Sequence, residues 1–331
     1  MSDDGLGLLA ARVEALPDAL AATLRAPMPD LSALRRARRV VTTGVGGSEG
    51  PARVCAALLR ERTGRCARFA PLSRLACEDD PLDDTALVVF SQGVSANARI
   101  ALGRREIRAM ALVTAADRGA LDARGVRPDL AVIRHAPTEE DGLLVRVIGP
   151  AAATLAAIRL CDALVGEETP ALAAVPSAVR DALGRPWAAL DPARPVALVG
   201  CDLGMDLLHG QRWKWLEALR RSDASVWDAL GFAHGPLQLT AERPTNLALF
   251  TPARPREARL FARMESLLLG DGHTVLRVPA TLPGALGFFE HDAGWSAALL
   301  ATLRAHPRDL LRWPAQGRDG ALYDLDAPIE G

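Results

Sequence analysis

Short apolar runs of four or five residues recur along this chain, and each is followed by a polar turn and then by a helical pattern. A continuous apolar run of this length is typical of a strand that is buried on both faces. Strands that alternate with helices predict parallel sheets with helices on both faces. In the first half of the chain these runs are residues 40–43, 87–90, 110–113 and 130–133.

The same alternation restarts in the second half, after a polar, proline-containing segment that runs to Pro192. Predicted strands at residues 196–200, 247–250 and 274–278 are again separated by helical patterns. Ahead of both halves, the first thirty residues have apolar positions at near-helical spacing, which predicts an amphipathic helix. We therefore predict an α/β protein with two three-layer αβα sandwich domains around parallel sheets. The expected division is an N-terminal helix in residues 1–34, a first domain in 35–185 and a second in 186–331.

Composition and charge exclude several classes of protein. The 331 residues, 49% of them apolar, are enough to bury two cores. A formal net charge of −1 gives no long-range attraction to nucleic acid or to an anionic membrane. No run approaches 18 consecutive apolar residues, so we expect no transmembrane helix. Residues 1–4 are acidic where a secretion signal would be basic, and the five cysteines contain no C-x-x-C pair, so we expect reduced thiols in a cytoplasmic protein.

Two loops of the first half have the composition of an anion-binding turn. Residues 44–48 (Gly-Val-Gly-Gly-Ser) and 91–95 (Ser-Gln-Gly-Val-Ser) each join a predicted strand to a helix, where doubly wound sheets bind ligands. Glycines allow close approach of the backbone, and serine hydroxyls at two helix N-termini suit a phosphomonoester. Either loop alone could be only a tight turn with a good helix cap. A dinucleotide site is less favoured, because Gly50 is one residue out of register for a G-x-G-x-x-G pattern.

Lys214, Glu217 and His234 have the residue types that proton transfer at a sugar carbon requires. Lys214 is the only lysine in a chain that is otherwise rich in arginine, and Glu217 falls on the same face of a predicted helix. Glu217 could be a general base whose pKa is raised by partial burial, or one half of a surface ion pair. His234 precedes Gly235-Pro236 in a turn, and it could be functional or a solvated loop histidine.

Other candidate residues are less distinctive. His135 follows a predicted strand and could line the cleft of the first domain, with Glu139 and Glu140 close behind it. His209 is expected to be structural. Residues 290–292 (Glu-His-Asp) come nearest to a metal cluster, but three consecutive residues of a regular element cannot all point at one ion, so we predict no metal site.

The loops, the Lys-x-x-Glu pair and the His-Gly-Pro turn resemble, in this order, motifs of the sugar isomerase (SIS) superfamily over residues 35–330. Gly46-Gly47-Ser48 is similar to the family's first phosphate loop, Gly-Thr-Ser, and Ser91-Gln92 to the start of its second, Ser-Gln-Ser-Gly-Glu-Thr. The arrangement of two such domains resembles the isomerase half of glucosamine-6-phosphate synthase and the phosphosugar deglycases and deaminases.

This resemblance implies a phosphosugar aldose–ketose isomerase, with or without amine release, that works through an enediol(amine) intermediate. Glu217 would move a proton between C1 and C2, Lys214 would stabilise the oxyanion or orient Glu217, and His234 would assist ring opening. No cofactor or metal is required, and because the His-Gly-Pro turn reaches a neighbouring subunit in the family, a homodimer is implied. The residues implied to bind the sugar phosphate are Gly47, Ser48, Ser91, Gln92, Ser95 and Glu140.

Two departures from the family pattern keep a second interpretation open. The second loop is one residue shorter than usual, with Gly93-Val94 where a serine and an acid are common. Residues 317–323 near the C-terminus contain no lysine, whereas the synthase uses a tail lysine that covers its site and can form an imine. Both departures favour a non-catalytic sugar-phosphate sensor or partner subunit, while the presence of Lys214, Glu217 and His234 together favours an enzyme.

Overall fold

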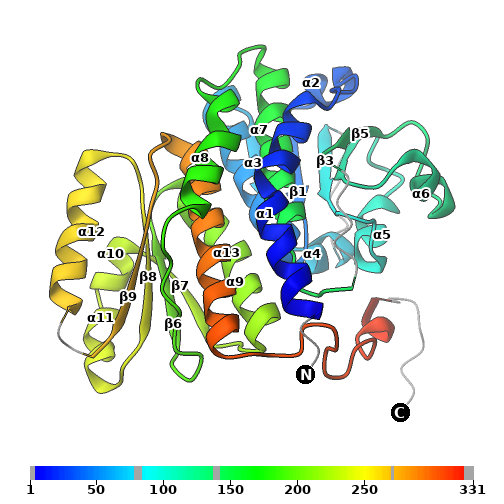
Figure 1. The fold of residues 1–331 in the computed structure, drawn as a ribbon. Coiled ribbons are helices and arrows are strands. Elements are labelled where there is room, and N and C mark those ends of the chain that lie inside the picture. The colour runs from blue at the N-terminus through cyan, green and yellow to red at the C-terminus, as the bar shows by residue number, and fades with distance from the viewer. Residues whose placement is uncertain (1–3, 78–83, 137–141, 270–271, 324–331) are drawn as a thin grey trace.

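The computed structural model describes residues 4–77, 84–136, 142–269 and 272–323, and it contains two separate parallel sheets (Figure 1). The first sheet has five strands in the order β2-β1-β3-β4-β5. Its strands are β1 (Arg39–Thr43), β2 (Cys66–Phe69), β3 (Thr85–Phe90), β4 (Ala109–Thr114) and β5 (Ala131–Arg134). From β1 the chain first forms β2 on one side of β1 and then crosses to the other side to form β3. The carboxyl ends of β1 and β3 therefore flank the topological switch point of this sheet.

The second sheet has four parallel strands in the order β7-β6-β8-β9, and its switch point lies between β6 and β8. Its strands are β6 (Val196–Gly200), β7 (Ala224–Asp228), β8 (Asn246–Thr251) and β9 (Thr274–Pro279). Two separate parallel sheets confirm the predicted fold class. Strands β2 and β7 were not predicted from the sequence, because both are short edge strands whose residues are largely only partly buried and which contain no continuous apolar run.

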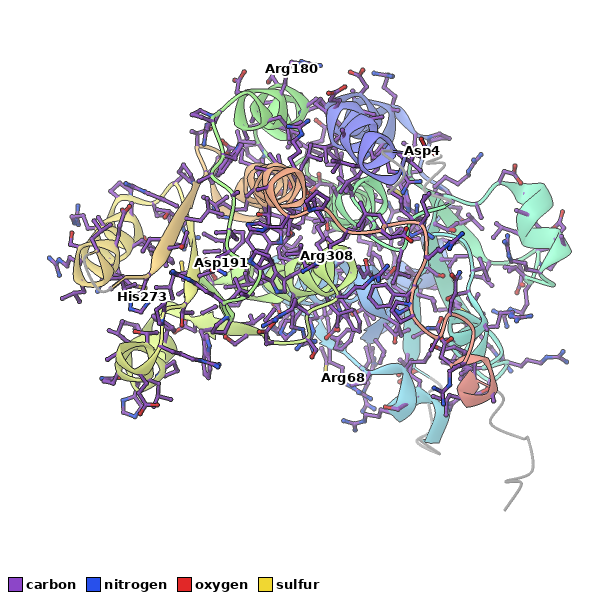
Figure 2. All side chains as sticks on the ribbon, turned by 60° about the horizontal axis from the view of Figure 1, so that its bottom comes forward. Asp4, Arg68, Arg180, Asp191, His273 and Arg308 are labelled. Carbon is purple, nitrogen blue, oxygen red and sulfur yellow. The ribbon has the colours of Figure 1, made fainter. Side chains whose placement is uncertain are left out.

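A layer of helices fills the space between the two sheets. It contains α1 (Asp4–Arg25), α3 (Glu49–Thr63), α7 (Ile148–Val165), α8 (Val175–Leu183), α9 (Leu203–Leu219) and α13 (Gly287–Ala305). Helix α3 packs on α7 and α9, and α1 packs on α7, α8 and α13. Figure 2 shows several of these helices nearly end-on, with side chains filling the layer. One core runs from Phe90 of the first sheet to Val278 of the second, so α1 joins both halves of the molecule.

The outer face of each sheet is covered by a second set of helices, which completes the αβα arrangement in each half. Helices α4 (Leu72–Cys77), α5 (Ala96–Leu102) and α6 (Arg118–Ala123) lie on the first sheet, and α10 (Ala229–Ala233), α11 (Pro236–Leu239) and α12 (Pro255–Leu268) on the second. The short helix α2 (Ser32–Arg36) connects α1 to β1. Separate apolar clusters hold each outer layer in place.

Helix α7 and the C-terminal tail both bear on where ligands can bind. Among the described residues α7 is the one helix long and apolar enough to cross a membrane, but 78% of that stretch is buried inside the fold, as in a core helix. Residues 306–323 leave α13 and run back towards the first sheet, where the short helix η5 (Gly320–Tyr323) contacts α5 (Figure 1). The tail therefore lies beside the loops that follow the first sheet.

Candidate functional site

A cavity of about 570 Å³ lies where β1 and β3 end, and we call it the loop cavity. Strands β1 and β3 are paired, with Thr43 opposite Val89, so the loops that follow them emerge side by side. All five residues of these loops that the sequence singled out line this one cavity: Gly47, Ser48, Ser91, Gln92 and Ser95. The fold thus joins two loops that are more than forty residues apart in the chain.

The first loop has a conformation that only glycine permits. A Cβ atom on Gly44 would lie 2.5 Å from the carbonyl oxygen of Ser48, and Gly46 has a φ of +62°. Residues Gly46–Ser48 form a turn of 3₁₀ helix, η1, that leads directly into α3. Ser48 occupies the N-cap position of α3, as predicted, but its side chain makes no capping hydrogen bond. Its hydroxyl is therefore not committed to the helix.

The second loop is strained at Val94, and Ser91 and Gln92 make close contacts within the loop and with the start of α7. Val94 has a φ of +53°, a left-handed conformation that is a genuine outlier for a β-branched residue and that clusters at ligand sites. Ser91 is 6% exposed, and its Oγ accepts a hydrogen bond from the Ser95 amide at 3.3 Å. A Cβ atom on Gly149 would lie 2.4 Å from Oε1 of Gln92, so a glycine at the start of α7 leaves room for this amide.

Three charged residues of the loop cavity were missed by the sequence analysis. Arg146, just before α7, is half-buried and forms no ion pair among the described residues. Arg124 donates to the carbonyl of Ala120 at 3.4 Å, and Asp117 accepts from the Ala120 amide at 2.8 Å, which caps α6. No motif marks these residues, because they reach the cavity from the connections that follow β4 and β5.

His135 also lines the loop cavity, as the sequence analysis expected. It is 2% exposed, its Nδ1 lies 3.3 Å from the carbonyl oxygen of Ala136, and its Nε2 has no hydrogen-bond partner among the described residues. Burial lowers the pKa of His135 to about 4, so the imidazole is neutral at pH 7. Glu139 and Glu140, which were expected nearby, lie outside the described residues.

Burial of His135 and His291 should make the protein sensitive to acid. Burial lowers the pKa of His291 to about 4 as well, although its Nε2 lies 3.0 Å from the carbonyl of Thr251. Because the unfolded chain binds these protons near pH 6.5, stability should be lost as the pH falls from about 6.5 to about 4, by roughly 3 kcal/mol per histidine.

Urea unfolding at a series of pH values checks this expectation. The combined His135→Gln and His291→Gln variant should lose a smaller part of its free energy of unfolding over this range than the wild type. The variant of an exposed histidine, His306→Gln, is the matched control and should keep the wild-type slope. An unchanged slope in the double variant would contradict the proposed origin of the acid sensitivity.

Lys214 lies in the core between α9 and α13 and does not line the loop cavity. The residue is 2% exposed, and Nζ lies 2.5 Å from Oδ1 of Asp292 and 2.9 Å from Oγ of Ser296. Gln211 donates to the same carboxylate oxygen at 2.7 Å. The surface ion pair with Glu217 that the sequence left open is therefore replaced by a buried pair with Asp292.

Glu217 and His234 also lie outside the lining of the loop cavity. Glu217 is half-buried near the end of α9, and His234 is exposed between α10 and α11. The structure thus brings the phosphate-type loops together within one chain, but it brings neither Glu217 nor His234 into the wall of that cavity.

Helix α9, which carries Glu217, nevertheless contacts Glu49, the residue that follows the first loop. Trp213 Nε1 donates to Oε2 of Glu49 at 3.3 Å, and Nδ1 of His209 lies 3.9 Å from Oε1. Arg53 donates to the same carboxylate at 2.9 Å. Because Glu49 directly follows Ser48, these contacts tie α9 to the N-cap of α3. His209 lies beside this contact, but its Nδ1 has no hydrogen-bond partner among the described residues.

Residues 290–292 use their polar groups in three different directions. Glu290 accepts hydrogen bonds from the amides of Thr281 and Leu282 at 2.7 and 2.8 Å, and Asp292 accepts from Lys214. Within the described part of the chain, no group of three histidine, cysteine or acidic side chains is arranged to hold a metal ion.

Known proteins resemble this chain in structure, whereas comparisons of its sequence find no match. No protein-family model matches the sequence, and no curated protein matches it. The C-terminal domain of glucosamine-fructose-6-phosphate aminotransferase from Francisella tularensis aligns with a TM-score of 0.72 at 12% identity, over 91% of this chain and 97% of that chain.

Two further solved structures align over most of their length. Glucosamine-6-phosphate deaminase from Thermotoga maritima has a TM-score of 0.66 at 16% identity, over 91% of this chain and 94% of that one. Tagatose-6-phosphate ketose/aldose isomerase from Escherichia coli has a TM-score of 0.65 at 15% identity, over 93% and 91%. At such identities the likeness is one of fold. The chain therefore has the double sugar isomerase fold that its motifs resemble.

Proposed function

We propose that this protein binds a sugar phosphate in the loop cavity and interconverts its aldose and ketose forms, with or without release of an amine. One observation carries the proposal: two serine-containing loops that follow neighbouring strands at a switch point line a single cavity. Solved structures of the same fold are named for sugar phosphate substrates, which supports this class of ligand.

The phosphate is held by neutral groups of the two loops. Ser48, Ser91 and Ser95 supply hydroxyls, and the amides at the start of α3 add donors at the positive end of a helix dipole. Gln92 and Gly47 complete this side of the cavity. Binding at such a site needs no metal ion and no redox cofactor.

Proton transfer falls to Glu217 and His234 in this proposal. Glu217 acts as the base that moves a proton between C1 and C2, on a helix tied to the first loop through Glu49. Because Glu217 does not line the loop cavity, the sugar carbons extend out of that cavity towards α9 in this proposal. Exposed His234 assists ring opening in the site of a neighbouring copy, so the active protein is a homodimer. Lys214 is engaged with Asp292 inside the core, and it acts as a positioning residue for α9.

A sugar-phosphate sensor or partner subunit is the second candidate function. It is favoured by the absence of Lys214, Glu217 and His234 from the cavity wall. Among the described residues that line the loop cavity, Asp117 is the only carboxylate, and it caps α6. A sensor needs the phosphate contacts alone, so exchange of a substrate proton separates the two functions.

A thermal-shift screen over hexose and pentose phosphates and their amino derivatives tests the binding that both functions share. The combined Ser48→Ala and Ser91→Ala variant should bind the best ligand about 100-fold more weakly than the wild type does. The reason is that each lost hydrogen bond to a charged group costs roughly 1.5 kcal/mol or more of binding free energy. The turnover of bound substrate should change little. Ser177→Ala is the control, since this exposed hydroxyl bonds only its own helix start. Equal affinities of both variants would contradict the phosphate site.

A further inference from the structure

Arg146 lines two cavities. One is the loop cavity, and the other, of about 580 Å³, lies between the connection that precedes α7 and the C-terminal tail. We call the second one the tail cavity. Its lining combines apolar and polar side chains: Leu143, Leu144, Trp313, Gln316, Arg318 and Asp319. The half-buried ring of Trp313 lies among charged and amide groups in this lining, which suits a polar ligand rather than an apolar one.

The guanidinium of Arg146 is available to an anion. The side chain is half-buried and forms no ion pair with any described residue. A partly desolvated charge without a counter-charge is costly, and a bound carboxylate or phosphate would offset that cost. Arginine suits this task because its planar group offers two parallel hydrogen bonds to such an anion.

Arg146 also lies close to the phosphate loops. A Cβ atom on Gly47 would be 3.9 Å from Cβ of Arg146, so the arginine begins at the wall of the loop cavity. The loops already offer three hydroxyls and the start of α3 to one phosphate. A guanidinium at the boundary between the two cavities is therefore placed to bind a different part of the same ligand.

We propose that the ligand is a sugar phosphate with a second anionic group, a carboxylate or another phosphate, which Arg146 binds at the entrance to the tail cavity. The remainder of the substituent lies beneath residues 310–319, beside Trp313. The proposal rests on the proposed function for the placement of the first phosphate in the loop cavity. It names the substrate class as doubly anionic sugar phosphates with a substituent on the end remote from that phosphate.

Calorimetric titration with three probes tests this assignment: a hexose 6-phosphate, the hexose 1,6-bisphosphate and an N-carboxymethyl amino-hexose 6-phosphate. The wild type should bind the bisphosphate or the carboxylate at least about tenfold more tightly than the hexose 6-phosphate, a difference of about 1.4 kcal/mol. Which of the two binds more tightly identifies the second group. Arg146→Gln should remove the preference and leave the affinity for hexose 6-phosphate within about threefold. Arg146→Lys should retain part of it, because the charge remains without the paired hydrogen bonds.

The control is Arg118→Gln, since Arg118 forms an exposed pair with Asp122 and does not line either cavity. If Arg146→Gln weakens all three probes equally, Arg146 belongs to the loop phosphate, and the inference is wrong while sugar phosphate binding stands. A wild type without any preference also overturns it. If no probe binds, the proposed function fails together with the inference.

Amide hydrogen exchange tests where the substituent lies. The preferred doubly anionic probe should slow exchange in residues 310–319 more than hexose 6-phosphate does, because only that probe extends beneath the tail. The difference should disappear in Arg146→Gln. Equal protection by both probes in the wild type would overturn the placement in the tail cavity.

Discussion

Glu217→Gln should abolish exchange of the substrate's C2 proton with solvent deuterium while leaving the affinity for the substrate nearly unchanged. The carboxylate supplies a base that acts in the transition state, whereas binding depends on Ser48, Ser91 and the other groups of the loop cavity. Loss of a general base typically slows a reaction by roughly 10²- to 10⁴-fold, or about 3 to 5 kcal/mol. Deuterium incorporation followed by NMR, together with calorimetric binding, measures both effects.

Glu265→Gln provides the matched control for this variant. Glu265 is also a half-buried helical glutamate, but it lies on α12 and its carboxylate is 3.7 Å from Arg277. It should leave exchange at the wild-type rate. If the wild type binds a sugar phosphate but incorporates no deuterium over hours, the proposed isomerase function is wrong and the sensor function replaces it.

Lys214→Met should destabilise the folded protein by about 3 to 5 kcal/mol. The substitution removes the cation of a buried pair and leaves the carboxylate of Asp292, which is fully buried, without its counter-charge. Ser296 also loses its donor. Urea unfolding should show a lower midpoint with a similar slope, because the surface exposed on unfolding changes little.

The double variant Lys214→Met with Asp292→Leu tests whether the loss of stability comes from the unpaired carboxylate. Replacing both charges with apolar groups removes the unpaired carboxylate, so the double variant should be more stable than Lys214→Met alone. Its affinity for a sugar phosphate should equal that of the wild type, since Lys214 does not line the loop cavity. A Lys214→Met protein of wild-type stability would contradict the buried pair as a stabilising element.

The sequence by itself determined the fold class and the residues of the phosphate-type loops. Continuous apolar runs such as 87–90 report burial on both faces of a strand, and Gly44 and Ser48 report the turn and helix start that follow β1. These signals are local: they arise from the period of the side chains and from the allowed backbone conformations of single residues. Edge strands β2 and β7 carry a weaker signal, because most of their residues are only partly buried and form no continuous apolar run.

Only the tertiary structure decided which charged groups meet. The spacing of Lys214 and Glu217 places them near each other on one helix, but the partner of Lys214 is Asp292, 78 residues away on α13. Arg146 carries no motif, and its position between two cavities follows from the way the connection after β5 and the C-terminal tail pass the loops. Pairings of this kind depend on how distant elements pack, and the helical or strand period of a single segment contains no information about its partner.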